Sequence, residues 1–76
     1  MTMNIEGPDS RLSSVLGGLS VDERREVIES IKEECGIRKQ NRSTVRHWLQ
    51  GNTPNVLYRE HIDLALCKHG LGRIYS

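Results

Sequence analysis

The fold is decided by residues 27 to 51, which read VIESIKEECGIRKQNRSTVRHWLQG. In the first part of this stretch, apolar side chains recur at spacings of one, three and four, the stripe of an amphipathic helix: Val27, Ile28, Ile31 and Cys35. Gly36 follows as a left-handed helix stop. In the second part Val45, Trp48 and Leu49 fall within an arc of about 100°. The stretch therefore predicts two helices, the second ended by Gly51, joined by the basic segment 38–42.

Start signals place the beginnings of these helices and of a third one. Ser20-Val21-Asp22-Glu23 fits a capping box, in which the Ser20 and Glu23 side chains each accept a backbone N–H. Asn41 or Ser43 can cap the next helix. Thr53 as cap and Pro54 in the first helical position predict the third start. That helix should close at Gly70 and present one face to the core: Tyr58, Ile62, Ala65, Leu66 and His69, widened by Leu57 and Leu64.

The two ends of the chain read differently. Residues 1–8 are polar and end in Gly7-Pro8, which predicts a flexible arm. Asp9 or Ser10 can cap a short helix carrying Leu12, Val15 and Leu16, ended by Gly17-Gly18. The tail carries Leu71, Ile74 and Tyr75, apolar enough to fold back onto the core. We therefore predict an all-α fold without strands: residues 9–76 form a single domain, a small bundle of three main helices plus a short N-terminal one.

Composition limits the class of protein. A chain of 76 residues makes one domain with a small core, and 36% hydrophobic residues is an ordinary globular value. The two cysteines are too few for a disulfide framework, so buried free thiols are the default. No apolar leader and no run of about 18 apolar residues occurs. We therefore expect a cytoplasmic protein with no membrane association.

Metal chemistry and catalysis are poorly supported. The available metal ligands lack a Cys-x-x-Cys or His-x-x-x-His pair: Cys35, His47, His61, Cys67 and His69. A small helical domain rarely encloses the cleft that nucleophilic catalysis needs, and no glycine-rich phosphate loop is present. We expect neither a metal, nor a cofactor, nor an enzyme.

The charges are unevenly divided along the chain. Residues 20–36 carry six acids and three bases, a net charge of −3, whereas residues 37–59 carry five bases and no acid. Such a division within one small domain suggests a cationic face for an anionic partner. A solvated surface with unevenly placed charges is the alternative.

The segment from Ser43 to Gly51, with Thr44-Val45, Trp48-Leu49 and Gly51 at their spacings, resembles the recognition helices of bacterial and phage helix-turn-helix regulators of the repressor-like or resolvase-like type. The Gly36-Ile37 turn and the Thr53-Pro54 start are also similar. The resemblance covers about half of the chain and implies sequence-specific binding of double-stranded DNA and transcription regulation, with a homodimer as a possible state. One departure is clear: Ile37 and Val45 are eight positions apart instead of five, so residues around Lys39, Gln40 and Asn41 lengthen the turn.

The residue types support the same function without the family. With Val45, Trp48 and Leu49 turned inward, the outward face of the second helix carries hydrogen-bonding groups and no acid: Ser43, Arg46, His47 and Gln50. Arg46 can recognise guanine and Gln50 adenine, while His47 is either a groove contact or an idle surface residue. Ser43 and Thr44 suit phosphate contact through free N–H groups and the helix dipole. Further basic side chains are expected on phosphates: Arg38, Lys39, Arg42 and Arg59.

A protein-binding module is the rival interpretation. In that case the acidic helix 20–36 docks a basic partner, or the basic surface 37–59 docks an acidic one. Leu12, Val15 and Leu16 would then serve a dimer contact instead of the core.

Overall fold

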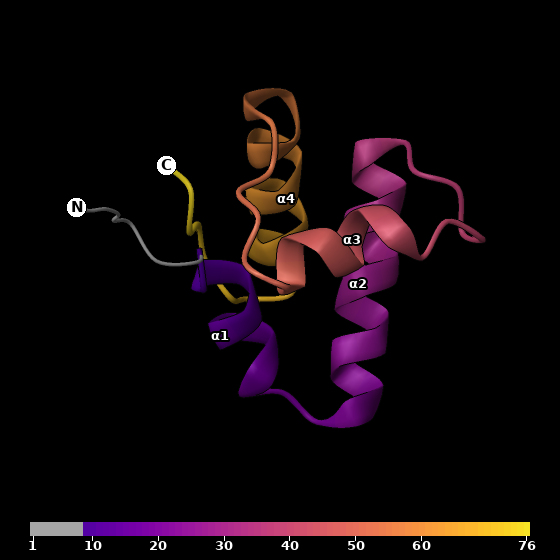
Figure 1. Cartoon of the computed structure of the whole chain (residues 1–76). Coiled ribbons are helices and arrows are strands. Elements are labelled where there is room, and N and C mark those ends of the chain that lie inside the picture. The colour runs from indigo at the N-terminus through magenta and orange to yellow at the C-terminus, as the bar shows by residue number, and fades with distance from the viewer. Residues whose placement is uncertain (1–8) are drawn as a thin grey trace.

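The computed structural model describes residues 9–76, which form four α-helices and contain no strand (Figure 1). The helices are α1 (Arg11–Gly17), α2 (Val21–Cys35), α3 (Ser43–Leu49) and α4 (Val56–Lys68). This all-α arrangement confirms the predicted fold class. The arm predicted for residues 1–8 lies outside the described residues. Within the described part of the chain, no helix has the length and apolar character needed to cross a membrane.

The core forms where α4 packs along α2, and α1 and α3 cover it from the side (Figure 1). Ile31 of α2 and Ile62 and Leu66 of α4 are completely buried. Burying one such side chain contributes about 1.5–3 kcal/mol to folding. The rest of the buried apolar set comes from all four helices: Leu12, Leu16, Val27, Val45, Trp48 and Ala65. The N-terminal stripe of Leu12 and Leu16 is therefore core, and Val15 packs against it.

The ends of α2 are set by the signals that the sequence predicts. The Ser20 hydroxyl accepts the Glu23 N–H at 3.2 Å and the Glu23 carboxylate accepts the Ser20 N–H at 3.3 Å, which completes the capping box. At the other end Gly36 has φ 73°, in the left-handed region. The N–H groups of Gly36 and Ile37 donate to the carbonyls of Glu33 and Lys32, the paired closure that left-handed caps make.

The start of α4 was predicted wrongly. The helix begins at Val56 instead of Pro54, and Asn55 is its cap, because the Asn55 side chain accepts the Leu57 N–H at 3.0 Å. Pro54 is buried in the preceding loop. The Thr53 hydroxyl donates to the Asp9 carboxylate at 3.0 Å. Thr53 and Pro54 thus hold the loop against the start of α1.

The core face of α4 is narrower than predicted. Leu57 and Leu64 are 75% and 40% exposed, and His69 is also exposed. At 3.6 residues per turn, Leu57 and Leu64 lie about 140° and 160° around the helix from Ile62. They therefore point away from α2, and the core face consists of Ile62, Ala65 and Leu66 with Tyr58 beside it.

The C-terminal tail returns to the helices, as predicted, through a polar contact that the sequence analysis did not anticipate. One carboxylate oxygen of Asp63 accepts the backbone N–H groups of Ile74 at 2.8 Å and Tyr75 at 3.1 Å. Asp63 is 1% exposed, so these bonds lie out of water. The Arg11 guanidinium stacks over the Tyr75 ring at 4.6 Å, which ties the tail to α1 as well.

Candidate nucleic-acid interface

One face of α3 is free of contacts with the core. Val45 and Trp48 are 3% and 6% exposed and turn inward, and Leu49 is half-buried. The opposite face is exposed and carries Ser43, Arg46 and His47, three of the four polar residues that the sequence analysis assigned to it. The fourth, Gln50, is the exposed residue that directly follows the helix. Two loops hold this short helix in place, because Asn52 donates its side-chain N–H to the His47 carbonyl at 2.9 Å and Asn41 caps the other end.

The start of α3 differs from the expectation of free N–H groups. The Asn41 side-chain oxygen accepts the N–H groups of Ser43 at 3.0 Å and Thr44 at 3.2 Å. Asn41, and not Ser43, is therefore the capping side chain, and Ser43 is the first helical residue. The Thr44 hydroxyl also faces the Asn41 oxygen, at 3.4 Å, and Thr44 is half-buried. Of Ser43 and Thr44, the two residues expected to contact phosphate, Ser43 is the one whose side chain is exposed.

The lengthened turn between α2 and α3 is tied to the domain at two points: Ile37 packs against the core, and the Lys32 ammonium donates to the Lys39 carbonyl at 3.3 Å. Within the turn, the Asn41 N–H donates to the Arg38 carbonyl at 3.0 Å. The extra residues thus form a compact loop. Arg38, Lys39 and Arg42 are exposed on it, beside the start of α3.

A groove of about 310 Å³ runs between α2 and α3. Ile28, Val45 and Leu49 form its apolar part, and Lys32, Arg42 and Arg46 surround them. The groove joins two predicted contact residues, Arg42 and Arg46, to Lys32 of α2. Sequence reasoning missed Lys32, because this lysine lies in a segment whose net charge is negative.

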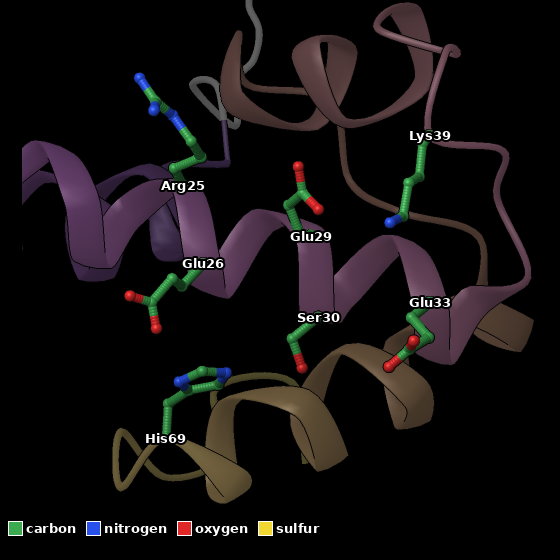
Figure 2. A pocket seen from close by; sticks show the side chains of 7 residues that line it. All are labelled: Arg25, Glu26, Glu29, Ser30, Glu33, Lys39 and His69. Carbon is green, nitrogen blue, oxygen red and sulfur yellow. The ribbon is translucent and has the colours of Figure 1, made fainter.

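The acids of α2 gather on a different edge. Asp22, Glu26, Glu29 and Glu33 recur at spacings of four, three and four, so they share one side of the helix. Figure 2 shows the last three of them around a hollow of about 390 Å³, with His69 at the end of α4 pointing toward this edge. Arg25 and Lys39 line the same hollow, so three carboxylates and two cations share this edge.

Arg59 lies in another part of the surface. Its Nε–H donates to the Pro54 carbonyl at 2.9 Å, and the residue lines a hollow of about 300 Å³ beside the C-terminal tail, with Asp63 and Tyr75. Arg59 is half-buried there. Its guanidinium supports the loop before α4, whereas Arg38, Lys39, Arg42 and Arg46 stay exposed on α3 and the loop before it.

The cysteines do not share one environment. Cys35 is half-buried, and burial raises the pKa of its thiol to about 11, with the Glu34 carboxylate acting in the same direction. Cys67 is exposed, which corrects the expectation of two buried thiols. Among residues 9–76, no group of three or more His, Cys, Asp or Glu side chains is arranged to hold a metal ion.

Comparison with protein-family models, with curated proteins and with solved structures gave no match to this chain.

Proposed function

We propose that this domain binds double-stranded DNA in a sequence-specific manner and thereby regulates transcription, with α2, the loop 36–42 and α3 acting as a helix-turn-helix. The observation that carries the proposal is the exposed face of α3, which presents Ser43, Arg46, His47 and Gln50. A major groove about 12 Å wide admits one helix. The opposite face of α3 is packed on the core, so the helix is held rigidly for such contact.

Arg46 and Gln50 are the residues proposed to read base edges. They lie one turn apart on the exposed face, and a guanidinium and a carboxamide pair with guanine and adenine through two hydrogen bonds each. Arg38, Lys39 and Arg42 contact phosphates on the flank next to α2. Such contacts fix the orientation of a protein on the duplex but carry no sequence information.

The distribution of charge supports duplex DNA as the partner. Arg42 and Arg46 line a groove whose described lining contains no acid, whereas Lys39 of the loop lies over the same hollow as Glu29 and Glu33 (Figure 2). A negatively charged backbone therefore reaches Arg42 and Arg46 at a groove that Glu26, Glu29 and Glu33 do not line.

The test is fluorescence anisotropy of a labelled mixed-sequence duplex over a series of salt concentrations, with the matching single strand as control. We expect log affinity to fall against log salt with a slope of about −3 to −5, because each neutralised phosphate releases counterions. Selection from a random duplex library should then give a preferred site. Failure to bind the duplex at low salt, or equal affinity for all duplex sequences, would overturn the proposal.

A further inference from the structure

The groove between α2 and α3 combines an apolar floor with a cationic border. Ile28, Val45 and Leu49 supply the floor, and Lys32, Arg42 and Arg46 supply the border. The described residues that line this groove include no acid. Phosphates gain contacts from the border but nothing from the aliphatic floor, since apolar surface stabilises a complex only when other apolar groups cover it.

The groove continues along α2. A neighbouring hollow of about 410 Å³ shares Ile28, Lys32 and Arg42 with it. This second hollow adds Val21, which is 66% exposed, and three cations: Arg24, Arg25 and Lys39. Glu29 is the single acid in its lining. The two hollows together combine four apolar side chains with a lining in which cations outnumber acids.

We propose that this surface docks an acidic amphipathic helix of a partner protein. Apolar side chains that recur at every third or fourth residue of such a helix would cover Ile28, Val45 and Leu49. Its glutamates and aspartates would meet Lys32, Arg42 and Arg46. The charge complementarity selects this occupant, because a neutral helix leaves the cations unpaired and a basic one is repelled.

The docked helix excludes DNA, a consequence that rests on the proposed function. Arg42 and Arg46 belong to both contact sets, so one guanidinium cannot serve a partner carboxylate and a DNA phosphate or base at once. The partner therefore acts as a competitive inhibitor of DNA binding, with the two ligands weakening each other by the same factor.

The probe is a fluorescent peptide of about 14 residues, four helical turns, with leucines along one face and glutamates elsewhere. The control peptide has the same composition in scrambled order. Titrations at about 0.15 M salt limit long-range attraction. We expect the amphipathic peptide to bind at least tenfold more tightly than the scrambled one, with amide shifts in an ¹⁵N spectrum confined to α3, the loop before it and the side of α2 that faces α3. Equal affinities, no binding, or shifts centred elsewhere overturn the proposal.

Matched variants separate groove contacts from bulk charge. Arg42→Glu should weaken peptide binding about five- to tenfold, since it replaces an attractive exposed pair with a repulsive one. Arg73→Glu makes the same charge change at an exposed arginine of the tail, outside the groove lining, and should alter affinity less than twofold. Ile28→Ser should weaken binding, whereas Leu57→Ser, an exposed apolar loss on α4, should not. Thermal unfolding of each variant checks its fold; equal effects of the paired variants would overturn the groove assignment.

A competition experiment distinguishes the two proposals. Displacement of the labelled duplex by the amphipathic peptide, and not by the scrambled one, supports both. Peptide binding by a protein that never binds the duplex supports the groove and overturns the proposed function. Simultaneous binding of both ligands overturns the exclusion of DNA.

Discussion

The indole ring of Trp48 lies 5.5 Å from the ring of Tyr58, centroid to centroid, with the two planes inclined at 49°. Tilted aromatic pairs at such distances contribute about 0.5–1.5 kcal/mol beyond the burial of their surface. This pair connects α3 to α4. Because Trp48 lies opposite the exposed face of α3, the contact that stabilises the domain also fixes the orientation of the candidate interface.

Replacing Trp48 with alanine should unfold much of the population. The substitution removes a buried aromatic and its contact with Tyr58, which costs about 3–5 kcal/mol, a large part of the stability of a small domain. Urea unfolding followed by far-UV circular dichroism measures the loss. Gln50→Ala on the exposed face is the control and should stay within about 0.5 kcal/mol of the original protein. A Trp48→Ala variant with the same unfolding midpoint would show that the α3–α4 contact is dispensable.

Asp63 should matter for stability because it holds the tail. Asp63→Ala leaves the N–H groups of Ile74 and Tyr75 without their acceptor. Loss of hydrogen bonds to a charged group predicts a destabilisation of about 2–3 kcal/mol, together with faster amide exchange at residues 74 and 75. Asp63→Asn keeps an acceptor oxygen and should lose less. If the alanine variant exchanges these amides at the original rate, the tail is held by its apolar side chains alone.

The local signals of the sequence predicted much of the fold. Ser20, Glu23 and Gly36 act through backbone groups a few residues away, so their roles follow from spacing alone. Helical periodicity predicted which side chains of α3 point inward. Trp48 was placed correctly in the core because it lies on the apolar side of the helix, opposite the polar side. The same logic identified the exposed residues of the candidate interface.

The remaining features depend on contacts between distant segments. Thr53-Pro54 has the composition of a helix start, but Thr53 bonds to Asp9 and Asn55 takes over as cap. The backbone N–H groups that donate to Asp63 are more than ten positions away along the chain, so the spacing of residues within α4 could not predict these hydrogen bonds. Lys32 belongs to the groove only because α3 packs beside α2. Sequence periodicity predicts which face of each helix is buried, but it does not predict which neighbouring helix packs against that face.

Acid should weaken the contact between the start of α1 and the loop before α4. The Arg11 guanidinium, the Arg11 N–H and the Thr53 hydroxyl bond to the Asp9 carboxylate and hold its pKa well below its usual range, against the opposing effect of burial. A carboxylate of this kind stabilises the fold above its unfolded pKa of about 3.9. That contribution is lost as pH falls further, toward the folded pKa.

Asp9→Asn tests this linkage, because the amide does not ionise. The variant should be less stable than the original protein at pH 7, and the difference between the two should shrink as pH falls below about 4. Urea midpoints at several pH values between 7 and 2.5 give both curves. A difference that stays constant over this range would show that ionised Asp9 makes no net contribution.

The two thiols should react at different rates. Cys67 is exposed, whereas Cys35 is half-buried and its pKa is raised to about 11. At pH 8 only about one Cys35 thiol in a thousand is the reactive thiolate. Ellman's reagent should therefore label Cys67 in a fast phase that Cys67→Ser removes and Cys35→Ser leaves intact. One shared rate for both cysteines would contradict the assigned environments.

The double substitution Arg46→Ala and Gln50→Ala should reduce DNA binding without disturbing the fold. Both side chains are exposed, and alanine favours helices, so the unfolding midpoint should change little. Each lost base contact is worth about 1–3 kcal/mol of discrimination, so the preference for the selected duplex over a random one should fall by at least tenfold. Arg73→Ala, an exposed arginine of the tail, is the matched control and should leave that preference intact. Because Arg38, Lys39 and Arg42 remain in the double variant, most of the salt dependence of binding should also remain. If the double variant still discriminates between duplexes, this face of α3 does not take part in sequence recognition.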